Sequence, residues 1–150
     1  MLREDINSAL KEAMKAGEAR RVSTLRLINA AILARETSGP ERIKLNDADI
    51  VDVMGKMVKQ RQESFEIYEK AGRAELAAQE REEIEIISAY LPKQMSDLEA
   101  AHEISAMIKE IGAETLKDMG RTMAALKQRF AGRMDFGKAG AQVKKVLGGG

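Results

Sequence analysis

Lysine and arginine side chains gather in the last third of the chain. Residues 116–150 hold 8 Lys and Arg against 2 Asp and Glu, a balance of +6, whereas residues 1–93 hold 16 against 17. The cationic positions are Lys117, Arg121, Lys127, Arg129, Arg133, Lys138, Lys144 and Lys145. A surface of this kind binds nucleic-acid phosphates by releasing counterions. The alternative interpretation is an ordinary solvated face on small helices.

The cationic segment favours recognition of backbone and shape over base sequence. No aromatic side chain is interleaved with the cations to stack on bases. The apolar stripe of its first helix instead consists of residues typical of core packing, Met119, Met123, Leu126 and Phe130. We therefore predict a nucleic-acid-binding surface formed by the eight cations.

Four polar residues fall inside apolar helical stripes of the first part of the chain, namely Asn29, Arg61, Glu80 and Glu83. An unpaired buried charge would be very costly, so we expect Arg61 to meet the glutamates across two helices in a polar layer that fixes their register. The alternative is a paired-carboxylate site. A bundle that binds two metal ions uses a Glu-x-x-His on each of two helices, and His102 lies elsewhere.

Catalytic patterns are not evident. The sequence has no Cys and one His, so neither thiol chemistry nor zinc ligation by Cys and His is expected. His102 lies off the apolar stripe of its helix and is expected on the surface. Gly132 to Gly137 match neither a phosphate-binding loop nor a dinucleotide fingerprint. We predict no catalytic residue, no metal and no cofactor.

The elements that position these residues are expected to be helices throughout. Ala, Glu, Lys, Leu and Met abound, and apolar residues recur at spacings of three and four. Four amphipathic helices are predicted in residues 1–91, ending at Gly17, before Gly39-Pro40, near Gly72 and before Pro92. Leu33 and Leu76 are assigned to their apolar faces. This region is predicted to form a helical bundle.

A second domain is predicted over residues 96–150. Pro92 breaks the chain, and Ser96 with Glu99 forms a capping box at the start of a new helix. Three helices are expected, at about 97–111, 116–130 and 138–147, with Val146 on the apolar face of the last one. The fold class is therefore all-α, a helical bundle followed by a small three-helix domain.

Composition points to a cytoplasmic protein without a membrane span. The net charge is only +1, so any preference for a polyanion must be local. No window approaches the roughly 18 apolar residues of a spanning helix. Arg3, Glu4 and Asp5 occupy the place where a secretion signal would need an apolar core.

Six short motifs are spread over the chain, namely Lys59-Gln60-Arg61, Tyr68 to Arg73, Glu80 with Glu83, Tyr90-Leu91-Pro92, Lys117 to Gly120 with Met123, and Gly132 to Asp135. Taken together, they resemble the pattern of the YqeY family over essentially the whole chain. The chain departs from the family pattern at Phe136-Gly137, which follows Asp135 in place of a polar turn.

The resemblance implies a function in tRNA metabolism. Proteins of this family resemble the C-terminal tail region of one subunit of the glutamine-dependent aspartyl/glutamyl-tRNA amidotransferase, where the tail is a tRNA-contacting accessory element. The resemblance thus implies a tRNA-binding module linked to carbon-nitrogen ligation with glutamine as amido-N-donor, without catalysis of its own. The alternative is a scaffold that docks on an aminoacyl-tRNA synthetase or on the amidotransferase without touching RNA.

Overall fold

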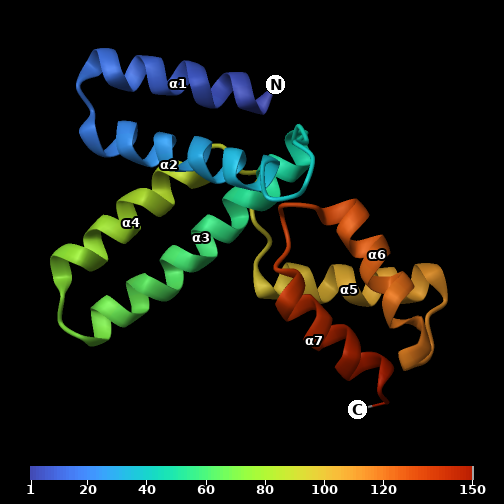
Figure 1. Cartoon of the computed structure of the whole chain (residues 1–150). Helices are drawn as coiled ribbons and strands as arrows, with labels where there is room; N and C mark the ends of the chain where they lie inside the picture. Colours follow the sequence, from blue (N-terminus) through green and yellow to red (C-terminus); the bar gives the residue numbers. More distant parts are fainter. Residues whose placement is uncertain (150) are drawn as a thin grey trace. The chain divides into compact units, whose positions relative to one another are not determined.

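The computed structural model describes residues 1–149, and within that range every regular element is helical (Figure 1). Seven α-helices and one short 3-10 helix are present in this range. The chain divides into two compact units, which we call the first unit (Met1–Leu91) and the second unit (Pro92–Gly150). No helix formed by residues 1–149 has both the length and the apolar composition required to cross a membrane.

The first unit consists of two helical hairpins. Helices α1 (Leu2–Ala16) and α2 (Ala19–Glu36) form one of them, and α3 (Asp47–Lys70) and α4 (Ala74–Ser88) form the other. Figure 1 shows each hairpin as two helices running side by side, with α2 between α1 and the second hairpin. Because α2 contacts α1, α3 and α4, it is the central helix of this unit.

Local sequence explains where these helices begin and end. Gly17 takes a left-handed conformation, with φ of 71°, which ends α1 and allows the chain to reverse into α2. The side chain of Asn46 accepts a hydrogen bond from the amide of Asp49, and Asp49 accepts one from the amide of Asn46, so α3 begins with a reciprocal cap.

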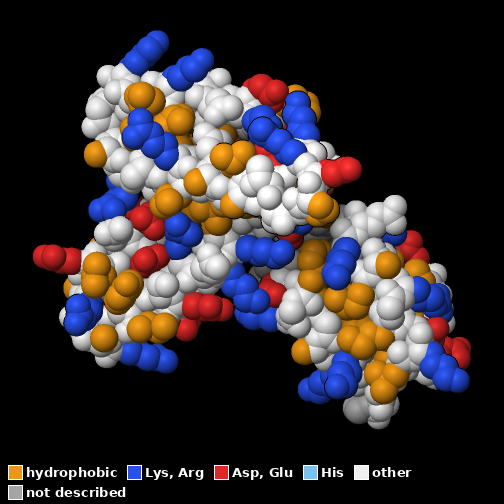
Figure 2. Space-filling model, in the orientation of Figure 1, with side chains coloured by type: hydrophobic (Ala, Val, Ile, Leu, Met, Phe, Trp, Pro, Cys, Tyr) orange, Lys and Arg blue, Asp and Glu red, His pale blue; other side chains and the backbone are white. Residues whose placement is uncertain are grey.

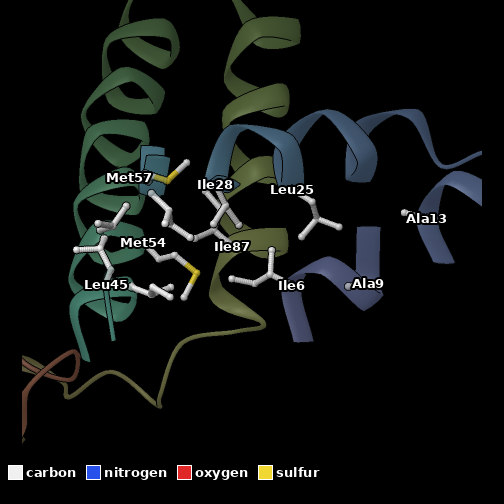
Figure 3. Packing of buried hydrophobic residues seen from close by; sticks show 12 residues of the cluster. Ile6, Ala9, Ala13, Leu25, Ile28, Leu45, Met54, Met57 and Ile87 are labelled. Atoms are coloured by element: carbon white, nitrogen blue, oxygen red, sulfur yellow. The ribbon is translucent and has the colours of Figure 1, made fainter. Parts of the chain in front are cut away.

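The core of the first unit is built from all four helices (Figure 3). Ile6 comes from α1, Leu25 and Ile28 from α2, Met54 from α3 and Ile87 from α4, and each is fully buried. Their apolar area, removed from water, supplies most of the driving force that holds the hairpins together.

Two residues assigned from sequence to the apolar faces of this bundle are exposed. Leu33 on α2 is 49% exposed, and Leu76 on α4 is 37% exposed. Those predictions were wrong because apolar residues occupy more of the circumference of α2 and α4 than the neighbouring helices cover. On α2 the buried side is taken by Leu25, Ile28 and Ile32.

The second unit is formed by helices α5 (Asp97–Ile111), α6 (Met119–Phe130) and α7 (Phe136–Leu147), with the 3-10 helix η1 (Leu116–Asp118) leading into α6. Ser96 caps α5 as the sequence predicts, since its hydroxyl accepts from the amide of Glu99. Asp135 caps α7 by accepting from the amides of Gly137 and Lys138. The last helix therefore begins two residues earlier than expected.

A separate core holds the second unit together. Its centre is formed by Ile104 and Met107 of α5, Leu126 of α6 and Val143 of α7, all at most 2% exposed. Val146, which the sequence assigned to the apolar face, is instead 41% exposed, and Ala139 lies in the core with Val143. The three helices turn their apolar sides inward and leave their charged sides for solvent.

Candidate nucleic-acid interface

The eight cations predicted to bind nucleic acid all lie in the second unit, and seven of them are exposed. Arg133 is the exception and is half-buried. The helices put them outside because Leu126, Phe130, Val143 and Leu147 occupy the inward positions of α6 and α7. Exposure alone does not make a cation available to a ligand, so the partners of each one matter.

The arginines are engaged within the unit. Arg121 donates from Nη1 to the carbonyl oxygen of Ile111 at 2.7 Å and from Nη2 to that of Gly112 at 3.3 Å, which satisfies carbonyl groups at the end of α5. Arg129 forms a bidentate pair with Glu110, at 2.7 and 3.0 Å. Both side chains join α6 to α5, a structural function that competes with binding a phosphate.

Arg133 and Lys138 also have partners in this unit. The Nε atom of Arg133 donates to the carbonyl oxygen of Lys93 at 3.2 Å, and the amide of Met95 donates to the carbonyl oxygen of Arg133 at 2.8 Å. These bonds tie the segment before α5 to the turn before α7. Lys138 lies 3.7 Å from a carboxylate oxygen of Asp97, a loose and exposed pair.

Asp118 organises the entry to α6. Its carboxylate accepts from the amides of Glu114 and Thr115, at 2.8 and 3.2 Å, and from Nε of Arg121 at 3.1 Å. These bonds, led by the two backbone amides, lower the pKa of Asp118 to about 2. Sequence reasoning did not assign Asp118 to the site, although its position three residues after Thr115 is a capping-box spacing that signals it.

Four lysines remain without a carboxylate partner. Among residues 1–149, no Asp or Glu oxygen lies within 4 Å of the ammonium groups of Lys117, Lys127, Lys144 and Lys145, and all four residues are exposed. Of the eight predicted cations, these lysines are therefore the ones best able to contact an anion.

Three of the four lysines come from neighbouring elements. Lys117 belongs to η1, and Lys144 with Lys145 lies in the last turn of α7. The 3-10 helix η1 contacts α7, and Figure 1 shows it beside the carboxyl end of that helix. We call Lys117, Lys144 and Lys145 the lysine cluster.

Lys127 lies apart from the lysine cluster. It is in the last turn of α6, eight residues and therefore about 12 Å along the helix from Met119. On the face of the second unit seen in Figure 2, blue side chains likewise stand at separate places and do not form one continuous field. Of the eight cations, three lysines thus come from two contacting elements, and the others are scattered or paired.

The predicted polar layer is formed in part by the first unit. Nε of Arg61 on α3 donates to Oε2 of Glu83 on α4 at 2.9 Å, and the two side chains are 15% and 9% exposed. Gln79 donates to the other carboxylate oxygen of Glu83, and Arg61 also donates to the carbonyl oxygen of Met57. Both members of the pair thus have further partners, as a structural tie between α3 and α4 requires.

Glu80 lies beside this pair, whereas Asn29 lies elsewhere. Glu80 lines the same groove as Arg61 and Glu83, and burial together with the charge of Glu83 raises its pKa. Asn29 on α2 donates instead to Oδ1 of Asn7 on α1, at 3.1 Å. The four residues therefore form two separate polar contacts, one in each hairpin, and not a single layer.

Residues 1–149 contain no group of three or more His, Asp or Glu side chains arranged to hold a metal ion. His102 is exposed on α5, as its position off the apolar stripe predicts. Throughout the same residues, no buried side-chain nitrogen or oxygen lacks a hydrogen-bond partner. The polar groups of the interior are thus accounted for by the fold.

Comparison with known proteins identifies one family model and two relatives. The family model described as Yqey-like protein matches residues 3–147. Over 82 residues the chain is 32% identical to the Candida glabrata protein called altered inheritance of mitochondria protein 41, mitochondrial; the match covers 55% of this chain and 45% of that protein. It is also 30% identical over 94 residues to an uncharacterized protein of Schizosaccharomyces pombe, covering 62% of this chain and 74% of the relative.

The chain thus spans 45% of the length of the Candida glabrata relative and 74% of the length of the Schizosaccharomyces pombe relative. The family match, in contrast, runs through both units and includes η1, α6 and α7, which carry the lysine cluster. The chain therefore belongs to the family of Yqey-like proteins.

Proposed function

We propose that this protein is a tRNA-binding accessory module and that the lysine cluster holds the tRNA backbone. The observation that carries the proposal is that Lys117, Lys144 and Lys145 are exposed, come from contacting elements and have no carboxylate within 4 Å among the described residues. Lysine ammonium groups on flexible stems suit phosphates in several orientations. The absence of exposed aromatic residues on these elements favours backbone contacts over base stacking.

The pairing of the arginines refines which residues contact RNA. Arg121 and Arg129 join α6 to α5 through hydrogen bonds to Ile111, Gly112 and Glu110. Their main function in this proposal is therefore structural. Lys127 and Lys138 are exposed and lie outside the lysine cluster. We assign the main phosphate contacts to the lysine cluster and supporting contacts to these two lysines.

In this proposal, the chemistry belongs to a partner. The resemblance to the tail of the amidotransferase links the chain to carbon-nitrogen ligation with glutamine as amido-N-donor, and the tail positions tRNA for other domains. We expect the purified protein, given glutamine, ATP and misacylated tRNA, to release no glutamate. Glutamate release over several turnovers would instead assign the chain an enzymatic function in amide transfer.

Titration with bulk tRNA at several salt concentrations tests the proposal. The variant Lys117→Gln, Lys144→Gln, Lys145→Gln removes three charges without adding a carboxylate. The affinity for tRNA should fall. The plot of log K against log salt, which slopes downward, should become less steep by roughly 0.7 to 0.9 for each phosphate that the protein no longer neutralises.

The matched control is Lys11→Gln with Lys15→Gln on α1. Both residues are exposed lysines without an ion pair among the described residues, and they lie in the first unit. This variant should bind tRNA like the parent protein. Equal losses in the two variants would indicate a general charge effect, and unchanged binding by the cluster variant would refute the proposed interface.

A second candidate function, a protein-interaction scaffold, is supported by a groove along α5. The groove has a volume of about 680 Å³ and is lined by Met95, Leu98, Ala101, His102 and Phe130, among others. Leu98 is 83% exposed, so the groove presents an apolar side chain that a partner could cover. The groove shares no residue with the lysine cluster, so a synthetase or the amidotransferase could occupy it without RNA.

Affinity capture with a purified amidotransferase or glutaminyl-tRNA synthetase, with and without nuclease, separates the two functions. Binding that depends on RNA disappears on nuclease treatment. Direct docking should survive nuclease treatment and should be weakened by Leu98→Asp. The control is Leu116→Asp on η1, at a leucine that is 50% exposed and lies outside the groove. This control variant should leave direct docking intact.

A further inference from the structure

The central helix of the first unit has a second apolar face that none of its neighbours covers. The buried side of α2 carries Leu25, Ile28 and Ile32. The opposite side, which we call the outer face of α2, is formed by exposed residues at helical spacing, Ser23, Arg26, Leu27, Ala30, Leu33, Ala34 and Thr37. Leu27 is 44% exposed and Leu33 is 49% exposed.

Charged residues are fewer on this face than in the chain as a whole. Asp, Glu, Lys and Arg make up 33% of the chain, yet Arg26 is the one charged residue among these seven positions. Two further charged residues near the end of α2 do not belong to the outer face. Arg35 forms an ion pair with Asp52 of α3 at 2.7 Å, and Glu36 is buried. In Figure 2, orange and white atoms run along the middle of α2, with blue groups around them. Depletion of charge around exposed leucines is typical of the centre of a protein interface.

The order of residues on the outer face is nearly symmetric about Ala30. Leu27 and Leu33 lie three positions before and after it, and Ser23 and Thr37 lie seven positions before and after it. In an antiparallel pair of identical helices that cross at Ala30, each position meets the one at equal distance on the other side. Leu27 of one copy would therefore lie against Leu33 of the other, and Ser23 against Thr37.

The same pairing explains why Arg26 is tolerated. In a parallel pair, Arg26 would face Arg26 of the second copy, and the like charges would repel. In the antiparallel pair it faces the small residue Ala34, and the two arginines lie eight residues apart, about 12 Å along the axis. Alanine at positions 30 and 34 also permits the close approach, about 8 Å between axes, that small side chains allow.

We propose that the outer face of α2 is the interface of a homodimer in which two α2 helices pack antiparallel around a twofold axis through Ala30. One helix face of about four turns buries less than the roughly 800 Å² per partner of a standard interface, so the dimer is weak, with a Kd of about 10 µM to 1 mM. The lysine cluster lies in the other unit, so dimerisation and the proposed tRNA contacts are separately testable.

The chain contains no cysteine, which allows a site-specific crosslinking test. At an axis separation of about 8 to 10 Å and a Cα radius of about 2.3 Å, residues that face the twofold axis have Cα atoms about 3.4 to 5.4 Å apart. The wider part of this range overlaps the Cα separation of about 4.4 to 6.8 Å that a disulfide spans, and the cysteine side chains need only a small outward shift at the closer separations. The variant Ala30→Cys should therefore crosslink to itself under mild oxidation. Ala78→Cys, on an exposed alanine of α4, is the matched control.

We expect Ala30→Cys to form disulfide dimers roughly tenfold or more faster than Ala78→Cys, since pairing raises the effective concentration of the two thiols. Equal rates overturn the proposal. The register of the two helices has its own test. A mixture of Leu27→Cys and Leu33→Cys chains should form crosslinks faster than either variant alone. Faster crosslinking by either variant alone than by the mixture would contradict the antiparallel arrangement.

Sedimentation of the unmodified chain gives a measurement that does not depend on cysteine. The weight-average mass should rise with concentration over about 10 µM to 1 mM, and the double variant Leu27→Glu, Leu33→Glu should stay monomeric with the same helical circular dichroism. A parent chain that remains monomeric over that range refutes the dimer.

Discussion

Arg61 and Glu83 form an ion pair that is nearly closed to solvent, with Nε and Oε2 2.9 Å apart and side-chain exposures of 15% and 9%. The pair joins α3 to α4. Because Arg61 also donates to Met57 and Glu83 also accepts from Gln79, neither charge is left alone. Its removal should have different consequences depending on whether one or both residues are replaced.

Glu83→Leu should destabilise the protein by about 3 kcal/mol or more, because Arg61 then remains buried without a counter-charge. The double variant Arg61→Met, Glu83→Leu should lose less than that single variant, since neither residue then carries a charge. Urea denaturation of the parent, of the single variants Arg61→Met and Glu83→Leu, and of the double variant measures this. Strictly additive losses would show that the two side chains do not depend on each other.

Glu36 should tie the loop after α2 to the rest of the first unit. It is 3% exposed, and its Oε2 atom accepts from Nη2 of Arg3 at 2.7 Å and from the amide of Leu45 at 2.9 Å. The bond from the Leu45 amide, followed by that from Arg3, lowers the pKa of Glu36. Glu36→Gln should therefore speed hydrogen exchange at the Leu45 amide.

The control for this prediction is Glu41→Gln, at an exposed glutamate of the same loop. It should leave exchange at Leu45 unchanged. The pH dependence has a definite sign: a carboxyl group whose pKa is lower in the folded state stabilises the fold above its unfolded pKa, and this stabilisation is lost as pH falls through the folded pKa. Protection at Leu45 that increases on acidification would contradict the assignment.

Asp118 should remain ionised to unusually low pH. Its pKa of about 2 lies below the ordinary value of about 3.9 for an aspartate, because the Glu114 and Thr115 amides and Arg121 donate to the carboxylate. The stabilisation is present above about pH 4 and is lost between about pH 4 and 2. Carbon-detected titration of the Asp118 carboxyl group by NMR measures the pKa directly.

Asp118→Asn tests the consequence for the second unit. The amide keeps one acceptor but removes the charge that Arg121 and the backbone amides favour, so the variant should be less stable at pH 7 and should lose the acid dependence between about pH 4 and 2. Asp97→Asn, whose side chain is 90% exposed, serves as control. Equal acid sensitivity of the parent and Asp118→Asn would show that other carboxyl groups dominate.

Truncation of two adjacent residues of α2 should reduce the stability of the protein by very different amounts. Ile28 is fully buried, so Ile28→Ala should cost about 2 to 5 kcal/mol of unfolding free energy through reduced burial and the remaining cavity. Leu27 is 44% exposed, and Leu27→Ala should cost under about 1 kcal/mol in dilute solution. Thermal unfolding of both variants at low micromolar concentration decides this, and similar losses would contradict the orientation of α2.

Much of the fold followed from local sequence because helices depend on local interactions. The spacing of apolar residues predicted an all-α protein, and Gly17 and Ser96 marked helix ends that the structure confirms. Each signal acts within a few residues, through a left-handed turn or a capped amide, so no knowledge of distant contacts was required. The family motifs extended the prediction to the whole chain.

The candidate site depended on contacts that sequence does not encode locally. Eight cations were equivalent in the sequence, yet Glu110 and the end of α5 engage Arg129 and Arg121, while Lys117, Lys144 and Lys145 keep no carboxylate partner within the described residues. Periodicity likewise placed Leu33 in the core and grouped Asn29 with Arg61. Helical spacing fixes which residues share a face, but only the packing of one helix on another determines which face is covered and which charges meet.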